Sequence, residues 1–551
     1  MFCTHSQIHL FMSIAIKRVG MEGVAELNPT VNLLDFFNTQ IMPELQDTNH
    51  QQRPVVKAAA IKFISTFRKQ YGRNECVHLM PSMIGHLSSP VVVVHTFAAH
   101  AIERILSTKN EDRTAKMGAE QLRPFMEPLF QGLFTIIDNT EWNENEYVMK
   151  CVMRSLMTLR QEVLPITNTV IQKLVSALEH VSKNPRSPQF NHYLFESLAV
   201  LVKSVCQAEP NAVTTFETIL QGPFTSILAM DVAEFTPYVF QIFGQLLELR
   251  TAQTGLGDFF TGFFEMLKAP ANWEKGGNIP ALSRLLKAYI EQAPTELYNS
   301  NQLTGILGIF QKLMTTNKTE AQGILILNAV IVNFDPAALQ NYFSEIFRIL
   351  LMRLSRTKSA KYKSLFVSFL GLFAAKMGGT VLTNILESHT PGLTNHVVEV
   401  FWSQVLLTNA PTQRIDAKIQ VVGATRFLFE NGGGASLLDK CPAGFVQLVA
   451  GVVKILSSPS LRNQVTTVGV DDTEETIGVY DAQFSELVNA RASSAKDPFP
   501  ERVAIEKDFM TGLAQLSQQR PGVIGNLMNS TDSKVQQNFL ALLQNTGTQI
   551  A

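Results

Sequence analysis

Histidine and cysteine are the side chains from which a zinc or redox centre would be built in this chain. The sequence holds eleven histidines, but none lies in an HExxH motif, which places two ligands four residues apart on one helix face. His95 and His100 are five residues apart and do not share a face in that way. The five cysteines, at 3, 76, 151, 206 and 441, form no CxxC pair and are typical of inert thiols in a reducing compartment. We expect no metal.

Glycine-rich segments and nucleophile motifs would indicate nucleotide binding or covalent catalysis. The run from Gly432 to Gly434 is followed by Ala435 and Ser436 and lacks the lysine of a GxxxxGK[ST] loop. Gly255-Leu256-Gly257 lacks the third glycine of a dinucleotide fingerprint, and no GxSxG elbow is present. We therefore expect both segments to be turns, the chain to use no cofactor, and the protein not to be an enzyme.

Two clusters of charge are the candidates for binding another protein. The basic cluster lies at the end of one expected helix and the start of the next, and the acidic cluster lies in a threonine-containing loop. Each can attract a partner of opposite charge, but each can equally be a solvated helix end or loop, since exposed charges interact weakly one at a time. The basic cluster is Arg348, Arg353, Arg356, Lys358, Lys361 and Lys363; the acidic cluster is Asp471, Asp472, Glu474 and Glu475.

Composition excludes several further classes of protein. With 46% hydrophobic and 17% charged residues the chain is expected to fold, and its formal net charge of -1 provides no field for nucleic acid or an anionic membrane. The stretch 77–102 has no Asp, Glu, Lys or Arg, but it contains Pro81, Pro90 and four histidines. We interpret it as two helices and a turn rather than a membrane span, and the apolar stretch near Ile8 is too short for a good signal peptide.

Apolar residues recur at the three- and four-residue spacing of amphipathic helices along most of the chain. Examples are Met126, Leu129, Phe130, Leu133 and Ile136; Leu194, Leu198, Leu201 and Val205; and Leu282, Leu285, Leu286, Tyr289 and Ile290. We count about two dozen such segments of roughly 12 to 20 residues and almost no strand pattern. In pairs they give a period of about 40 to 47 residues, typical of HEAT repeats, which bury their apolar faces by stacking. The prediction is an all-α HEAT-repeat superhelix, a curved solenoid of antiparallel helix pairs.

Short breaks separate the expected helices. Four pairs of a hydroxyl or carboxylate residue followed by proline are expected to begin helices, the first residue acting as a cap. They are Ser89-Pro90, Thr236-Pro237, Asp335-Pro336 and Thr390-Pro391. Longer loops are expected at 107–121, 431–434 and 457–476. Residues 1–30 fit the helical pattern poorly, so we divide the chain into a divergent segment, 1–30, and a solenoid, 31–551.

Particular sequence segments indicate a family, which the helical periodicity alone does not. The chain resembles the CAS-type exportins of the importin-β (karyopherin) superfamily in segments that include loop and polar residues which a generic HEAT repeat does not dictate. These are VVHTFAAHAIER at 93–104, ENEYVMK at 144–150, VSKNP at 181–185, FNHYLFE at 190–196, PYVFQ at 237–241, GNIPAL at 277–282, GIFQKL at 308–313 and YDAQFS at 480–485. The resemblance covers roughly residue 31 to the end of the sequence and corresponds to the C-terminal portion of the family.

The resemblance implies a nuclear export receptor that binds importin-α together with Ran in its GTP form and returns importin-α to the cytoplasm. It also implies contacts with nuclear pore proteins and shuttling between nucleus and cytoplasm. It implies no nucleic acid and no membrane insertion, and it assigns GTP hydrolysis to Ran. Family members have a further N-terminal arm that contacts Ran, and we expect this chain to lack it. The alternative is a HEAT-repeat scaffold for another protein complex, which the same periodicity would serve.

Overall fold

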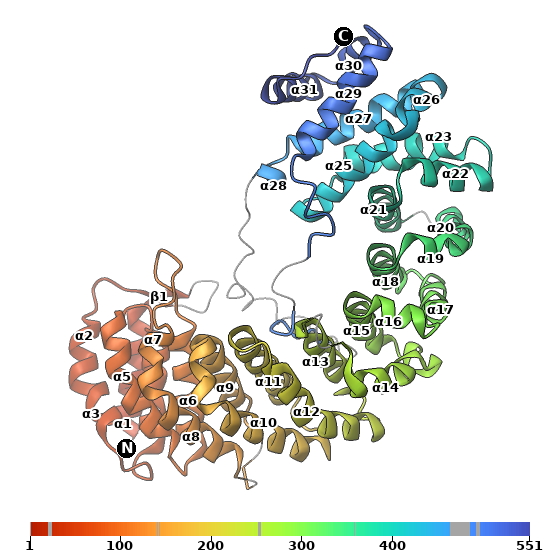
Figure 1. Cartoon of the computed structure of the whole chain (residues 1–551). Coiled ribbons are helices and arrows are strands. Elements are labelled where there is room, and N and C mark those ends of the chain that lie inside the picture. The colour runs from red at the N-terminus through yellow and green to blue at the C-terminus, as the bar shows by residue number, and fades with distance from the viewer. Residues whose placement is uncertain are drawn as a thin grey trace. The chain divides into compact units, whose positions relative to one another are not determined.

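The computed structural model describes residues 2–19, 25–139, 141–142, 144–251, 255–356, 359–462, 485–491 and 496–551. The chain divides into two compact units, one of residues 1–251 and 478–491 and the other of residues 252–477 and 492–551. Each unit is a stack of helix pairs (Figure 1). The predicted all-α fold of stacked helix pairs is therefore confirmed.

The first unit begins with one helix and a short hairpin and continues as helices. Its elements are α1 (Phe2–Ala15), β1 (Ile16–Val19), β2 (Ala25–Leu27), α2 (Leu33–Phe36), α3 (Met42–Gln46), α4 (Pro54–Thr66), α5 (Arg73–Leu87), α6 (Val92–Leu106), α7 (Ala119–Leu122), α8 (Met126–Ile137), α9 (Glu146–Leu159), α10 (Thr167–Ser182), α11 (Pro188–Ala208), α12 (Ala212–Ala229) and α13 (Thr236–Leu249). The antiparallel pair β1–β2 falls within 1–30, and the division of the chain at residue 30 stays a prediction.

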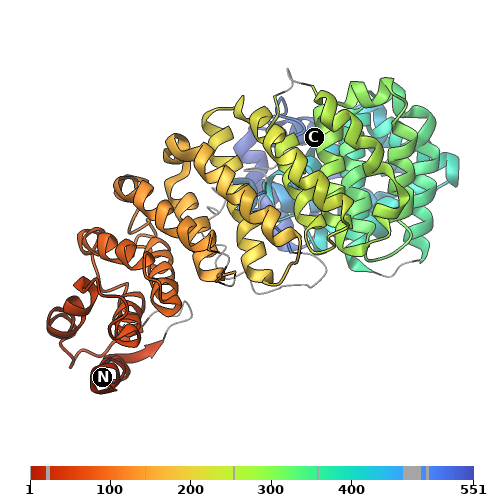
Figure 2. The same cartoon turned by 90° about the horizontal axis from the view of Figure 1, so that it is seen from below.

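Two layers of helices form the first unit. Helices α4, α6, α9, α11 and α13 pack side by side in one layer, and α5, α8, α10 and α12 form the other. Figure 2 shows these helices from below, coloured from red to yellow in chain order. Ile102 of α6, Val152 of α9 and Leu198 of α11 are fully buried. The apolar stripe of each helix therefore covers the next pair, as a repeat stack requires.

The second unit continues the same arrangement. Its helices are α14 (Gly257–Lys268), α15 (Ile279–Gln292), α16 (Pro294–Asn299), α17 (Leu303–Leu313), α18 (Glu320–Asn333), α19 (Pro336–Leu339), α20 (Phe343–Arg356), α21 (Ala360–Met377), α22 (Gly379–His389), α23 (Leu393–Val397), α24 (Ser403–Thr408), α25 (Arg414–Phe429), α26 (Gly433–Lys440), α27 (Pro442–Leu456), α28 (Pro459–Arg462), α29 (Ile505–Gln519), α30 (Val523–Asn529) and α31 (Ser533–Thr546). Helices α15, α18, α21, α25 and α29 follow one another in one layer. Between α21 and α25 the backbones approach closely, because Gly371 faces Gly423.

The first residue of a proline pair caps a helix at Asp335 but not at Thr236 or Thr390. Asp335 caps α19 as predicted, since its carboxylate accepts the N–H of Ala337 at 2.7 Å. Capping by Thr236 is wrong, because its hydroxyl donates to the Val232 carbonyl instead. Capping by Thr390 is also wrong, because it ends α22, and the N–H groups of the turn that begins α23 are accepted by the Glu387 carboxylate of the preceding helix.

The structure shows where the predicted loops and the uncharged stretch 77–102 lie. The stretch 77–102 lies in α5 and α6, with Pro81 inside α5 and the break at Ser89-Pro90. The glycine run is a sharp corner, in which Gly432 has φ +77° and α26 begins at Gly433. Of the loop predicted at 457–476, the described part holds the short α28, and 463–476 lie outside the described residues. Across the described helices, none has the length and apolar character needed to cross a membrane.

Candidate partner-binding sites

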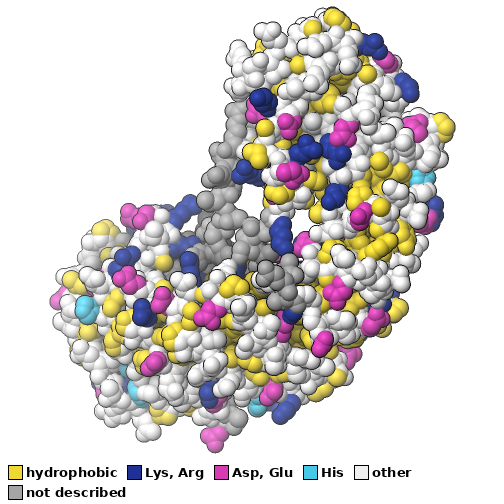
Figure 3. Space-filling model, viewed as in Figure 1, with side chains coloured by type: hydrophobic (Ala, Val, Ile, Leu, Met, Phe, Trp, Pro, Cys, Tyr) yellow, Lys and Arg dark blue, Asp and Glu magenta, His cyan; other side chains and the backbone are white. Residues whose placement is uncertain are grey.

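The predicted basic cluster lies at the junction between α20 and α21. Arg348, Arg353 and Arg356 are on α20, and Lys361 and Lys363 are on the first turns of α21. Lys358 and the whole acidic cluster, Asp471, Asp472, Glu474 and Glu475, lie outside the described residues. On the face shown in Figure 3, cationic and anionic side chains are interspersed over both units, in keeping with the balanced net charge.

Two of the arginines bind carboxylates of their own chain. Arg353 donates two hydrogen bonds, of 2.9 and 2.7 Å, to Glu320 at the start of α18, whose side chain is only 1% exposed. Its guanidinium also lies 5.9 Å from the ring centroid of Tyr362. Arg348 donates to the exposed Glu345 one turn earlier, at 2.7 Å. The role of Arg353 is thus to neutralise a buried carboxylate between repeats, which is a structural task.

The remaining part of the basic cluster faces outward. Arg356 and Lys361 are exposed, and Lys363 lies over the ring of Phe401 at 5.9 Å from its centroid. Lys361 also borders a pocket of about 470 Å³ whose lining includes Asp416. This outward part of the cluster is the part that can meet an acidic partner.

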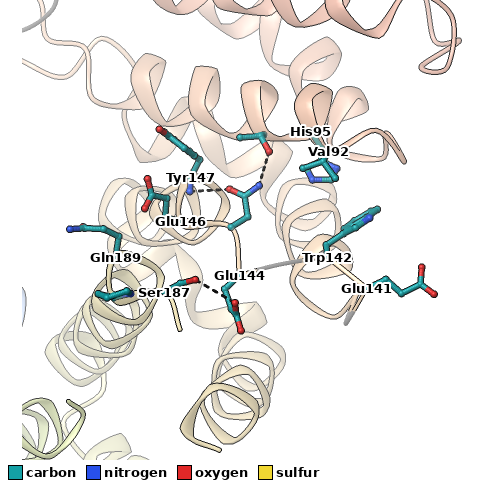
Figure 4. Close-up of a pocket in the computed structure, with 12 residues that line it drawn as sticks. Val92, His95, Glu141, Trp142, Glu144, Glu146, Tyr147, Ser187 and Gln189 are labelled. Atoms are coloured by element: carbon teal, nitrogen blue, oxygen red, sulfur yellow. Dashed lines mark hydrogen bonds between the residues drawn. The ribbon is translucent and has the colours of Figure 1, made fainter. Parts of the chain in front are cut away.

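A second candidate site, which the sequence analysis did not single out, is a pocket at the N-terminal ends of α6, α9 and α11. It has a volume of about 480 Å³ and opens between the α8–α9 connection and the starts of these three helices (Figure 4). Its described lining residues are Val92, His95, Thr96, Glu141, Trp142, Glu144, Asn145, Glu146, Tyr147, Ser187, Pro188 and Gln189.

Hydrogen bonds fix the walls of this pocket. The Asn145 side-chain oxygen accepts the N–H of Tyr147 at 3.1 Å and so caps α9, while its amide donates to Thr96 of α6 at 2.6 Å. The Ser187 hydroxyl, just before α11, donates to Glu144 at 3.4 Å (Figure 4). One short loop is thereby tied to helices of the neighbouring repeats on both sides, which holds the pocket open.

Charge and aromatic surface define what the pocket can bind. Glu141, Glu144 and Glu146 line it together with Trp142 and Tyr147, and its described lining includes neither lysine nor arginine. Tyr147 is 43% exposed although it is a large aromatic residue. Carboxylates beside aromatic faces suit a cationic side chain, which gains both ion pairing and cation–π attraction.

His95 forms the inner wall of the pocket and remains neutral. Its Nδ1 donates to the Ser89 carbonyl at 3.0 Å, and its ring centroid lies 4.6 Å from that of Trp142. Burial lowers the pKa of His95, so its ring adds no positive charge that would repel a cationic ligand. The segment ENEYVMK at 144–150 was the signal in the sequence, but its acidic and aromatic residues become a pocket only when three repeats stack.

Comparison with known proteins assigns the chain to a family. Residues 103–543 match the family model described as CAS/CSE protein, C-terminus, and residues 4–102 match the model described as Cse1. The chain belongs to the CAS/CSE family. The resemblance to CAS-type exportins seen in the sequence is therefore confirmed, and the basic cluster lies within the C-terminal family region of this CAS/CSE chain.

Relatives of this CAS/CSE chain are longer than it is. Exportin-2 of Xenopus laevis is 34% identical over 533 residues, which cover 95% of the chain and 54% of that protein. Exportin-2 of Homo sapiens is 32% identical over 534 residues, with the same two coverages. The chain spans about half the length of the curated relatives it matches.

Solved structures share the fold of the CAS/CSE chain. The exportin Cse1 in its cargo-free, cytoplasmic state superposes with a TM-score of 0.79 at 24% identity, covering 98% of the chain and 54% of that protein. Importin beta has a TM-score of 0.58 at 13% identity, covering 100% of the chain and 66% of that protein. At these identities the likeness concerns the fold, which is that of the HEAT-repeat karyopherins.

Proposed function

We propose that this chain acts in a nuclear export receptor that binds importin-α together with Ran in its GTP form and returns importin-α to the cytoplasm. The observation that carries the proposal is the match to Exportin-2 at 34% identity over 95% of the chain, together with the family match over 103–543. Under this proposal the protein shuttles through the nuclear pore, contacts nuclear pore proteins, and catalyses nothing itself, since hydrolysis of GTP belongs to Ran.

Within this proposal the two candidate sites serve complementary partner surfaces. The outward residues Arg356 and Lys361, with Lys358 of the same cluster, suit an acidic surface, and the pocket around Trp142 suits a basic side chain. The acidic cluster Asp471, Asp472, Glu474 and Glu475 is proposed as a third contact, for a basic surface. Contacts spread over several repeats are the usual way in which a helical repeat protein binds a large partner.

Calorimetric titration of importin-α into the purified chain tests the function directly. We expect measurable binding of importin-α, and a difference between Ran loaded with a non-hydrolysable GTP analogue and Ran loaded with GDP that is smaller than full-length Exportin-2 gives in the same titration. Absence of importin-α binding under both conditions, with other proteins recovered from a lysate instead, would favour the scaffold alternative.

The pocket is tested in the same titration by reversing its charge. Replacing Glu141 and Glu146 with lysine is expected to weaken partner binding about tenfold, because two carboxylates that face a cation are lost. The double variant Glu501→Lys/Glu506→Lys, which changes exposed or half-buried acids far along the sequence, is the matched control. Equal affinities of the two variants would remove the pocket from the binding surface.

A further inference from the structure

A seven-residue segment, 485–491, packs within the first unit, although it is more than 200 positions away in sequence from the helices that it contacts. It lies between residues 252–477 and 492–551 of the second unit in sequence, yet it packs with α9, α11 and α13. Leu487 and Ala490 are completely buried there, and Asn489 is 6% exposed. These three residues are as buried as residues of the hydrophobic core, so the segment is packed into the unit and does not simply lie on its surface.

Two glutamines of α13 form hydrogen bonds with the main chain of the segment. Gln241 accepts the N–H of Leu487 at 2.8 Å and donates to the carbonyl of Ser485 at 3.0 Å. Gln245 donates to the carbonyl of Asn489 at 3.5 Å. One amide side chain thus pairs with a donor and an acceptor of the same backbone, as a neighbouring strand would, and this recognition does not depend on the identity of the side chains bound.

A buried carboxylate of α11 provides the rest of the recognition. Glu196 accepts the N–H of Val488 at 2.6 Å and the N–H of Asn489 at 3.0 Å, and its second oxygen also accepts the side-chain amide of Asn489 at 2.8 Å. Burial raises the pKa of Glu196, while the three donors oppose that rise. His192, 3.9 Å from this carboxylate, is a weak base whose pKa burial lowers to about 4. The donors of the segment are therefore what satisfies Glu196.

A buried acid that is satisfied by a peptide backbone has the chemistry of a peptide-binding groove. An isolated buried carboxylate is costly, so Glu196 requires donors from whatever covers it. We propose that the face of α11 and α13 around Glu196, Gln241 and Gln245 is a receptor groove for a peptide with a Leu-x-Asn-Ala core, bound with a turn over 488–491 that the Arg491 N–H closes on the Val488 carbonyl. Residues 485–491 fill this groove in cis. The groove is independent of the export function proposed above.

The segment is suited to act as a self-contained ligand. Its ends are joined by the Arg491 guanidinium, which donates two 2.7 Å hydrogen bonds to Glu486, and these two side chains are about half exposed. Recognition in the groove thus rests on the Ser485 carbonyl and on residues 487–490, while the ion pair supports the bound conformation and the Arg491 charge favours the ionised form of Glu196. A peptide of the same sequence should bind in trans once the cis copy is removed.

Peptide binding to the full chain tests the proposal. In one variant residues 485–491 are replaced by seven alternating glycine and serine residues, and a fluorescently labelled peptide SELVNAR is titrated by anisotropy. We expect saturable binding to this variant and at least tenfold weaker binding to the unaltered chain, where the tethered copy competes at high effective concentration. A folded linker variant that shows no saturable binding would overturn the proposal.

Matched peptides test which side chains of the segment contribute to binding in the groove. A peptide with Asn489→Ala is expected to bind about tenfold more weakly, because it loses the side-chain hydrogen bond to the Glu196 carboxylate. A peptide with Glu486→Gln alters only the exposed ion pair and should bind within about threefold of the original. Equal binding of the Asn489→Ala and original peptides would contradict recognition by Glu196.

Amide hydrogen exchange in the unaltered chain tests the groove even if the linker variant does not fold. The amides of Leu487, Val488 and Asn489 are expected to exchange far more slowly than in the free peptide, since all three are hydrogen-bonded to buried side chains. The full-chain variant Asn489→Ala should accelerate all three together. Exchange of these amides at free-peptide rates would defeat the groove.

Discussion

Glu196 and Asn489 lie 293 positions apart in the sequence, and the Glu196 carboxylate accepts both the backbone N–H and the side-chain amide of Asn489, at 3.0 and 2.8 Å. Most contacts in a stack of repeats join neighbouring helices, so a pair of this separation is unusual for such a fold. Its existence means that residues 485–491 contribute to the packing of the first unit, to which they belong.

The energetic coupling of this pair can be measured with a double-mutant cycle. Glu196→Gln places an NH2 group against the N–H donors of the segment, and Asn489→Ala removes one of those donors. We expect the effects on the free energy of unfolding to be non-additive by about 1 to 2 kcal/mol, since the two residues share hydrogen bonds. Chemical denaturation measures this, and the pair Glu486→Gln with Asn489→Ala serves as control because it should be additive.

The difference between local and distant partners explains how much of the structure the sequence predicts. Helices and their pairing follow from apolar spacing, and Asp335 caps its helix through a contact two residues away. Glu196 sits among the apolar residues of α11 and would ordinarily be assigned to the solvent side, because its donors come from 293 positions away. Arg353 likewise looked like a surface charge, since Glu320 is 33 positions distant and meets it only when α18 and α20 stack in register.

Removing Arg353 should cost far more stability than removing Arg348. Arg353→Met leaves the buried carboxylate of Glu320 without its cation, and we expect a loss of about 3 kcal/mol in the free energy of unfolding. Arg348→Met breaks an exposed pair and should change stability by no more than about 0.5 kcal/mol. Urea denaturation of the two variants beside the unaltered chain decides the matter; similar midpoints would mean that Glu320 finds another donor.

The close approach of α21 and α25 makes Gly423 intolerant of a side chain. A Cβ at this position would lie 2.1 Å from the carbonyl oxygen of Gly371, so the two helices would have to separate. Gly423→Ala is expected to destabilise the chain by about 2 to 3 kcal/mol. Gly308 in α17 has no heavy atom within 4 Å of its virtual Cβ, so Gly308→Ala should instead raise helix stability by up to about 1 kcal/mol. Thermal unfolding of both variants tests the contrast, and a neutral Gly423→Ala would show that the interface is loose.

Acid should destabilise the first unit through His86. Burial lowers the pKa of His86 from 6.5 to about 4, while its Nε2 donates to the Leu45 carbonyl at 2.9 Å. In the unfolded chain His86 is protonated as the pH falls through 6.5, whereas in the folded chain it is protonated only near pH 4. Stability is complete above pH 6.5 and falls as the pH drops towards 4, by at most about 3 kcal/mol. His192, with a pKa near 4, adds a similar slope.

The contribution of His86 is isolated by His86→Gln, which keeps an N–H donor near Leu45 and cannot titrate. The melting temperature of this variant should fall less steeply between pH 6.5 and 4 than that of the unaltered chain. His78→Gln, the same exchange at an exposed position, is the control. Parallel profiles for all three proteins would show that His86 is accessible to protons in the folded state.

Charge reversal at the α20–α21 junction tests the proposed basic contact without disturbing the fold. Arg356 and Lys361 are exposed, whereas Arg353 is committed to Glu320, so Arg356→Glu/Lys361→Glu changes the outward charge alone. We expect importin-α or Ran affinity to fall about tenfold and its dependence on salt to become weaker, because fewer cations face the partner. Lys507→Glu/Lys534→Glu, at exposed positions of α29 and α31, is the matched control. An unchanged affinity with an unchanged salt dependence would mean that these cations are solvated helix ends.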